Sequence, residues 1–172
     1  PARVERLDVS PMAPLGTAGF RVLESEPAAP RHAGLPADLA VCGECAAEVA
    51  TPADRRHGHP FASCTRCGPR YSLIESLPYD RARTAMRDFA LCGECAAEYA
   101  DPLDRRFHAE PIACPRCGPA LRLVAGDGRV LAERETALAG AVAAIARGEI
   151  VALKGLGGFQ LLADATSDAA VA

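Results

Sequence analysis

The alternation of apolar and polar positions predicts two strands and a linker before residue 38. Residues 3–9 alternate apolar and charged side chains, which is typical of a half-buried strand. After a break that contains proline and glycine, residues 19–23 predict a second strand. Residues 26–37 contain three prolines and are predicted to form an extended linker. Because two strands alone are only marginally stable, we expect this region to belong to a larger domain.

The last third of the chain has a pattern of alternating strands and helices. Residues 121–132 predict two short strands around the turn residues Gly126-Asp127-Gly128. Residues 135–147 place Leu, Val and Ile at helical spacing among alanines and predict a helix. A buried strand is predicted at 150–153 and a second strand at 160–163, on either side of a glycine-rich turn. This succession indicates the opening of an α/β domain.

The central third is a tandem duplication with a period of 50 residues. The stretch from Cys42 to Glu48 returns unchanged as Cys92 to Glu98, and the cysteines fall into equivalent positions. All eight cysteines of the chain form four Cys-x-x-Cys pairs in this region: Cys42, Cys45, Cys64, Cys67, Cys92, Cys95, Cys114 and Cys117. The first module is assigned to residues 38–73, the second to 89–123, and the connector between them to 74–88.

Composition supports several small cores in place of one large core. The chain has 5 Phe, 3 Tyr and no Trp in 172 residues, so burial of large side chains contributes little. The net charge of −3 does not favour a nucleic-acid-binding surface. No apolar run approaches the ~18 residues of a membrane span, and no signal peptide is evident. The chain starts at Pro1 without Met, which we take as a sign of a longer parent protein.

The cysteine pattern predicts metal binding rather than disulfide bonds. Without a secretory signal, Cys-x-x-Cys pairs followed by Gly indicate zinc in a reducing compartment. Four thiolates on one Zn²⁺ leave no coordination position for water or substrate, so both sites are expected to be structural. The first and fourth pairs could share one zinc, and the second and third the other. The duplication favours one zinc within each module.

Two sets of side chains near the cysteines are candidates for supporting roles. Four arginines in the first module could balance the charge of a zinc tetrathiolate, or could be solvated surface residues: Arg55, Arg56, Arg66 and Arg70. Three histidines do not recur at the 50-residue period, which favours packing or hydrogen bonding over metal ligation: His57, His59 and His108.

The glycine-rich turn after the strand at 150–153 carries the one lysine of the chain. An ammonium group and free backbone N–H groups could hold a phosphate. The sequence matches neither a dinucleotide-binding glycine motif nor a P-loop, and a plain tight turn is the alternative. The candidate substrate- or nucleotide-binding residues are Lys154, Gly155, Gly157 and Gly158.

Four stretches together resemble an internal segment of the hydrogenase-maturation carbamoyltransferases of the HypF type. They are Cys64 to Tyr71, Asp104 to Pro111, Cys114 to Pro119, and Ile150 to Phe159. The resemblance covers nearly the whole chain. It implies that residues 1–25 end an acylphosphatase-like domain, that 26–37 are a linker, and that 124–172 begin a YrdC-like domain. The implied fold class is a mixed α+β multidomain fragment, with tandem small four-cysteine zinc-finger modules between two incomplete α/β-type domains.

The resemblance also implies an activity for the longer protein. Members of the family use carbamoyl phosphate and ATP to make a carbamoyl-adenylate. They transfer the carbamoyl group to the C-terminal cysteine of a HypE-type partner protein, during maturation of [NiFe]-hydrogenase in the cytoplasm. None of the family's catalytic groups falls within this chain, which is therefore expected to bind two zinc ions and not to catalyse by itself.

Two other functions are weighed against this one. A free-standing zinc ribbon that binds nucleic acid or protein is permitted by arginine pairs near the cysteines, although the charge balance and the few aromatic residues disfavour nucleic acid. A thiol-redox or chaperone module of the DnaJ kind also has four Cys-x-x-Cys pairs. It differs in the residues around them, and it would need reactive thiols.

Overall fold

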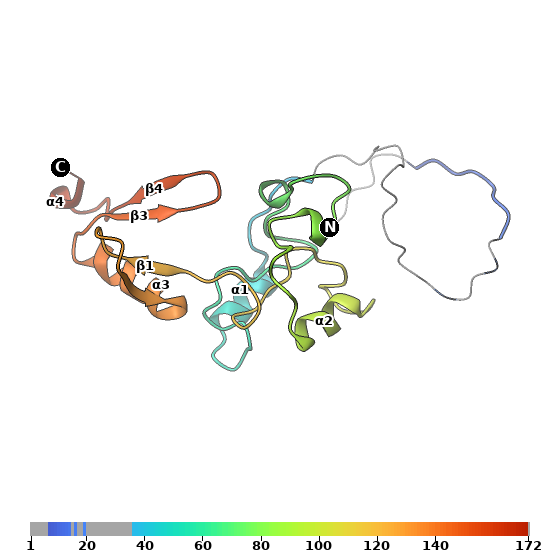
Figure 1. The fold of residues 1–172 in the computed structure, drawn as a ribbon, viewed down its shortest axis with the longest axis horizontal. Coiled ribbons are helices and arrows are strands. Elements are labelled where there is room, and N and C mark those ends of the chain that lie inside the picture. The colour runs from blue at the N-terminus through green and yellow to red at the C-terminus, as the bar shows by residue number, and fades with distance from the viewer. Residues whose placement is uncertain (1–6, 15, 17–18, 20–35, 172) are drawn as a thin grey trace.

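The computed structural model describes residues 7–14, 16, 19 and 36–171 of the chain (Figure 1). Residues 7–14, the described part of the first predicted strand and the break after it, contain no strand. The predicted strand at 19–23, apart from residue 19, and most of the predicted linker at 26–37 lie outside the described residues. No helix in the described parts of the chain is long and apolar enough to cross a bilayer, the longest having 13 residues.

Each cysteine module begins with a short α-helix. Helix α1 covers Gly43–Ala50, and helix α2 covers Gly93–Ala100. The alanines of both segments favour a helix. Pro52 and Pro102, two residues beyond the helix ends, stop the helices from continuing. Each helix begins at the residue directly after the first cysteine of its module. The first Cys-x-x-Cys pair is therefore the first turn of a helix in both modules, with Cys42 and Cys92 at the N-cap.

The second Cys-x-x-Cys pair of each module is a tight turn that depends on the glycine after it. Gly68 has φ +87°, a left-handed conformation that favours glycine, and exchanges two backbone hydrogen bonds of 3.0 Å with Leu39. Gly118 occupies the equivalent place in the second module. A Cβ atom there would lie 2.5 Å from the Cβ of Ala113 and 3.1 Å from the carbonyl oxygen of Cys114. Both positions require the small size of glycine, since a Cβ at Gly68 would lie 2.6 Å from that of Ser63, and Gly68 also requires its left-handed dihedral angle.

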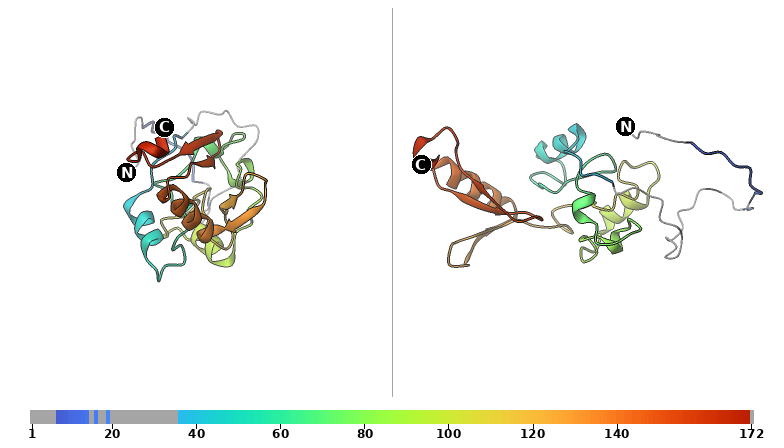
Figure 2. Two further views of the ribbon diagram at one scale, coloured as in Figure 1. Left: turned by 90° about the vertical axis from the view of Figure 1, so that its left-hand side faces the viewer. Right: turned by 90° about the horizontal axis from the view of Figure 1, so that it is seen from above.

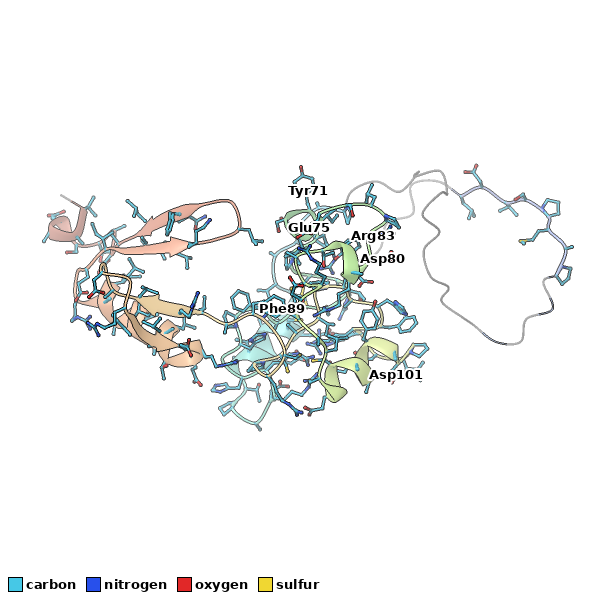
Figure 3. The ribbon with its side chains drawn as sticks, in the orientation of Figure 1. Tyr71, Glu75, Asp80, Arg83, Phe89 and Asp101 are labelled. Carbon is cyan, nitrogen blue, oxygen red and sulfur yellow. The ribbon has the colours of Figure 1, made fainter. Side chains whose placement is uncertain are left out.

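The connector at 74–88 is a folded part of the structure. It is flanked by the 3₁₀ turn η1 (Tyr71–Leu73) and contains the 3₁₀ turn η2 (Arg81–Arg83). Leu73 and Met86 pack with Ala113 of the second module, next to Phe89. In Figure 3, Phe89 lies among the module side chains, whereas Tyr71 projects from the outer edge. The connector therefore joins the two modules through a shared apolar cluster, to which it contributes Met86.

The connector is also fastened to the second module by one arginine. The guanidinium of Arg81 donates to the carbonyl oxygens of Glu110 (2.5 Å), Ile112 (3.1 Å) and Phe89 (2.8 Å). These bonds satisfy backbone acceptors that belong to no regular element, which fixes the loop before the third cysteine of that module.

The described C-terminal elements lie on one side of the module pair (Figures 1 and 2). Strands β1 (Arg122–Val124) and β2 (Val130–Glu133) form an antiparallel hairpin, with an irregularity after Leu123. Helix α3 (Arg134–Ala146) packs on this hairpin, so closely that a Cβ at Gly140 would lie 2.8 Å from Leu123. The two strands and the helix predicted from the sequence are confirmed.

A second hairpin follows α3. Strands β3 (Val151–Lys154) and β4 (Phe159–Leu162) pair in antiparallel register from Val151 opposite Leu162 to Lys154 opposite Phe159. A short helix, α4 (Asp168–Val171), comes last. Both strands are mostly exposed, with Phe159 and Leu161 more than two thirds accessible. The strand–turn–strand prediction is confirmed, but the predicted burial of the first strand is wrong, because the hairpin forms a sheet of only two strands among the described residues and leaves most of β3 exposed.

A small cleft of about 140 Å³ lies where both modules meet the start of α3. It is lined by residues 57–61 of the first module, by Pro115 and 119–121 of the second, and by Arg134 and Glu135. His59 is 4% exposed, and its Nε2 atom has no hydrogen-bond partner in the described structure. Burial, with the nearby charges of Arg56 and Arg134, lowers the pKa of His59 from 6.5 to about 4. The ring is therefore neutral at pH 7.

We predict that Gly118→Ala destabilises the second module. The added methyl group would overlap Ala113, so the free energy of unfolding is expected to fall by about 1–3 kcal/mol. Gly93→Ala is the matched control, because a Cβ at Gly93 would meet no atom within 4 Å. It should leave stability unchanged or raise it by up to ~1 kcal/mol. Urea unfolding at a fixed free-zinc concentration measures both, and equal midpoints for the two variants would contradict the packing described.

We also predict that His59 makes the stability of the chain depend on pH. The unfolded chain protonates this histidine near pH 6.5, whereas the folded chain does so only near pH 4. Stability is therefore full above pH 6.5 and is lost as the pH falls toward 4. Between pH 7.5 and pH 5, His59→Gln should avoid a loss of about 2 kcal/mol that the unmodified chain suffers. The control is His57→Gln, at an exposed position. Parallel stability–pH curves for all three chains would show that His59 is not the group responsible.

Candidate metal centres

The structure brings the eight cysteines together as two clusters of four. Each cluster has ligand atoms that all lie within 4.8 Å of one another. The members are Cys42, Cys45, Cys64 and Cys67 in the first, and Cys92, Cys95, Cys114 and Cys117 in the second. Each cluster lies within one module. The arrangement in which pairs are shared between modules, which the sequence leaves open, is not the one adopted.

The spacing of the sulfur atoms fits a tetrahedral ion and not a disulfide. Neighbouring Sγ atoms lie 3.8, 3.8 and 3.6 Å apart in the first cluster, and 3.8 and 3.7 Å apart in the second. A disulfide requires about 2.05 Å, and all eight cysteines are free. Four sulfurs placed tetrahedrally at about 2.3 Å from one ion lie about 3.8 Å apart. Both donor sets therefore fit Zn²⁺ in chemistry and in size.

Both clusters are closed to solvent on their inner side. Cys45, Cys64, Cys67 and Cys95 are fully buried, and Cys114 is 3% exposed. With four thiolates around one ion, no position remains for a substrate or a water molecule, which is the arrangement of a structural site. Neither cluster found in the described residues includes a histidine. His57 is exposed, His59 lines the cleft, and the His108 ring lies 4.6 Å from that of Tyr99.

In each helical turn, the pKa of the first cysteine is lowered and that of the second is raised. The backbone N–H of Cys45 at the start of α1 stabilises the thiolate of Cys42 and lowers its pKa to about 7. Burial raises the pKa of Cys45 to about 12, despite a hydrogen bond from Arg105. The second cluster repeats the pattern. Burial would raise the pKa of Cys92, but hydrogen bonds outweigh it and lower the pKa to about 7, whereas burial raises that of Cys95 to about 12. Metal binding must therefore displace protons from the inner cysteines.

Two pairs of arginines are exchanged between the modules. Arg55 and Arg56 extend from the first module to Cys95 of the second, with guanidinium–Sγ distances of 3.5 and 3.8 Å. Arg105 and Arg106 extend from the second module to Cys45 of the first, at 3.0 and 3.8 Å. We call Arg55, Arg56, Arg105 and Arg106 the exchanged arginines. Such a reciprocal pattern is that of an isologous interface, here between two repeats of one chain.

One glutamate on each helix completes the arrangement. Glu98 pairs with Arg55 at 2.6 Å and with Arg56 at 2.5 Å, and Glu48 pairs with Arg105 and Arg106. Burial would raise the pKa of Glu98, but hydrogen bonds from Arg56 and Arg55 outweigh it and lower the pKa to about 2. The pKa of Glu48 is lowered in the same way. Both carboxylates are therefore ionised and hold the guanidinium groups in place.

The sequence names Arg55 and Arg56 as candidates to balance the charge of a zinc tetrathiolate, and the structure shows which cluster they contact. Both lie on the cluster of the other module. Arg66 stays in its own module, where its side chain pairs with Glu44 and its backbone N–H donates to Sγ of Cys64 at 3.4 Å. Arg70 donates to the carbonyl oxygens of Cys64 and Pro69. The backbone N–H of Gly68 donates to Leu39 and not to a sulfur.

The candidate phosphate-binding residues lie far along the chain from both clusters, in the β3–β4 hairpin. Lys154 ends β3, and its ammonium lies 5.5 Å from the centroid of the Phe159 ring across the hairpin. Gly155 donates to the carbonyl oxygen of Gly158 at 2.8 Å, which closes the turn. Gly157 lies in the open part of that turn, where an added Cβ would meet no atom within 4 Å.

Sequence reasoning missed Glu48 and Glu98 as parts of the centres. The signal was available, because Glu48, Arg55 and Arg56 all recur unchanged 50 residues later. What the repeat could not reveal is which module each side chain contacts. That is decided by the docking of the two modules, which the local pattern does not encode.

Comparisons with known protein families agree with this geometry. The family model described as the HypF finger matches the chain twice, at residues 41–74 and 91–124. Each match contains one complete cysteine cluster.

Relatives extend the similarity to nearly the whole chain. The carbamoyltransferase HypF of Synechocystis sp. is 52% identical over 171 residues, which are 99% of this chain and 22% of that protein. The probable carbamoyltransferase HypF of Methanocaldococcus jannaschii is 48% identical over 162 residues, 93% of this chain and 21% of that protein. The chain thus spans about a fifth of the length of these relatives.

Solved structures show the same likeness in three dimensions. The crystal structure of T. kodakarensis HypF matches 80% of this chain and 18% of its own, with a TM-score of 0.75 and 47% identity. A full-length HypF in a phosphate- and nucleotide-bound form matches 78% of this chain and 17% of its own, with a TM-score of 0.65 and 44% identity. By its two fingers, its sequence and its fold, the chain is similar to a segment of the HypF carbamoyltransferases.

Proposed function

We propose that each cysteine cluster binds one structural zinc ion and that the chain is the finger-bearing segment of a carbamoyltransferase. The single observation that carries the proposal is the pair of closed tetrathiolate clusters on HypF-type fingers. The ligands are the eight cysteines named above. Zinc holds the fingers folded and takes no part in chemistry, because the sulfurs occupy every coordination position.

The activity of the longer protein is part of this proposal. It uses carbamoyl phosphate and ATP to form a carbamoyl-adenylate, and carbamoylates the C-terminal cysteine of a HypE-type partner in hydrogenase maturation. Relatives named carbamoyltransferase, near 50% identical over nearly all of this chain, support this assignment. The division into the end of an acylphosphatase-like domain, two fingers and the start of a YrdC-like domain belongs to the same proposal. Eight free thiols suit the reducing cytoplasm as its location.

The β3–β4 turn is the proposed contact of this segment with substrate or nucleotide. A cation–π contact at an exposed site is worth only about 0.5–1 kcal/mol, so a phosphate can draw the ammonium of Lys154 away from Phe159. Gly155, Gly157 and Gly158 leave the backbone of the turn open to a close approach by such a group.

The nucleic-acid alternative gains no support from the arginines. The exchanged arginines are directed at sulfur and carboxylate groups inside the finger pair, and Arg81 is directed at backbone carbonyls. Arg66 and Arg87 pair with glutamates. Guanidinium groups held in this way are not free to contact phosphates.

The test is carbamoyl-phosphate-dependent exchange between ATP and pyrophosphate, in a longer polypeptide that contains this chain and matches its relatives in length. Exchange is expected there and not in residues 1–172 alone. Lys154→Ala should reduce it about 10- to 100-fold, since a lost charge-assisted hydrogen bond costs about 1.5–3 kcal/mol. Arg147→Ala, which removes an exposed cation from the neighbouring helix end, is the control and should leave exchange unchanged. A folded, zinc-loaded long form without exchange would refute the proposed activity.

A further inference from the structure

Each buried exchanged arginine binds three separate parts of the opposite finger. Arg56 donates from Nε to the carbonyl oxygen of Ala113 (3.0 Å), from Nη1 to Glu98 (3.2 Å) and from Nη2 toward Cys95 (3.8 Å). Ala113 immediately precedes Cys114, so one guanidinium connects the helical turn of a finger with its second cysteine turn.

The reciprocal set has nearly the same geometry. Arg106 donates to the carbonyl oxygen of Ser63 (3.0 Å), to Glu48 (3.2 Å) and toward Cys45 (3.8 Å). Arg56 and Arg106 are 2% and 3% exposed, so these contacts lie inside the finger pair and are hardly weakened by water. The shape of each cluster therefore depends on an arginine that the other finger supplies.

The loop that carries each arginine pair is positioned by its own finger. The backbone N–H of Gly58 donates to Val49 at the end of α1 (2.9 Å), and that of His108 donates to Tyr99 at the end of α2 (3.0 Å). Both helices begin at the cysteines of their own cluster. A finger that loses its metal loses the anchor of its helix, and with it the position of the arginines that support the other cluster.

A direct backbone link reinforces one direction of this dependence. Thr65, inside the second cysteine turn of the first finger, donates from its backbone N–H (3.2 Å) and its hydroxyl (3.0 Å) to the carbonyl oxygen of Arg105. The equivalent residue in the second finger is Pro115, which has neither donor. The second cysteine turn of the first finger therefore holds Arg105 in place, and the side chain of Arg105 contacts Cys45 of the first finger.

The charge of the metal-loaded cluster determines whether the arginines of the other finger strengthen or weaken zinc binding. A zinc ion with four thiolates has a formal charge of −2, and the nearby Glu48 or Glu98 adds a further negative charge. Two guanidinium groups at each cluster offset that charge, and both come from the other finger. A correctly placed arginine pair favours the metal-loaded cluster over the empty one.

We propose that the two zinc sites are thermodynamically coupled, so that zinc in either finger raises the zinc affinity of the other through the exchanged arginines. The proposal rests on the zinc-binding function proposed above and defines how that function is regulated. Coupling between sites is reciprocal by necessity, and commonly amounts to about 5- to 150-fold. The finger pair then gains and loses its two ions together, as one unit.

The test measures the coupling factor directly on the full chain. The overall affinity for two zinc ions is obtained by native mass spectrometry across a series of chelator-buffered zinc concentrations. The affinity of each site alone is obtained from Cys92→Ser/Cys117→Ser, which disables the second site, and from Cys42→Ser/Cys67→Ser, which disables the first. The overall constant divided by the product of the two single-site constants is the coupling factor. We expect a factor of about 10 or more.

A variant of the arginines identifies the route of the coupling. Arg55→Gln/Arg105→Gln removes one of the two guanidinium groups at each cluster, leaves Arg56 and Arg106 in place, and should lower the factor by about threefold or more. Arg66→Gln/Arg116→Gln is the matched control, because it removes the same charge from arginines that pair with Glu44 and Glu94 of their own fingers. The control should keep the factor of the unmodified chain.

The outcomes separate the two proposals. Two bound zinc ions with a coupling factor of one, or a factor that Arg55→Gln/Arg105→Gln leaves unchanged, would overturn the coupling and leave the zinc function intact. A folded chain that retains no zinc would overturn both. If a chain with one site removed by Cys→Ser substitution does not fold, native mass spectrometry of the chain with all eight cysteines tests the coupling. Its singly loaded form should become more abundant in Arg55→Gln/Arg105→Gln and not in the control, and an equal abundance would overturn the coupling.

Discussion

The finger pair depends on one interaction above all, the gathering of four sulfur atoms around a point. In the first finger, the buried apolar cluster consists of Cys45, Cys64 and Cys67 alone, with Cys42 against it. The second finger adds only Ala109 and Ile112 to its buried set. Hydrocarbon burial on this scale does not hold a module folded. Structural zinc, with an apparent binding free energy of about 10–16 kcal/mol in finger peptides, supplies a term of the required size.

A tetrathiolate cluster creates an electrostatic problem that the duplication solves. The negative charge of each centre lies in a buried place, where it is costly unless it is compensated. The chain places Arg56 and Arg106 there, each held by a glutamate of the opposite helix. Because the repeats are related by a fixed shift of 50 residues, the same arginine and glutamate contacts form at both centres. Compensation of charge and docking of the fingers are thus achieved by the same side chains.

Local signals in the sequence predicted much of this, and long-range docking accounts for the rest. Cysteine spacing at Cys42 and Cys64 predicts the ligand sets, and turn chemistry at Gly126-Asp127-Gly128 predicts the β1–β2 hairpin. The destination of Arg55 and Arg56 could not be predicted, since a repeat looks the same whether its side chains face their own cluster or the neighbouring one. The folding of the connector could not be predicted for a similar reason, because Met86 gains its partners from both fingers, Leu73 of the first and Ala113 of the second.

Zinc K-edge X-ray absorption of the purified chain, together with its zinc content, tests the closed tetrathiolate centres most directly. The sulfur spacings of 3.6–3.8 Å predict two zinc ions per chain. Each ion should have four sulfur ligands at about 2.3 Å and no nitrogen or oxygen ligand. A nitrogen or oxygen ligand at either ion, or a single zinc per chain, would contradict the assignment of two structural four-cysteine sites.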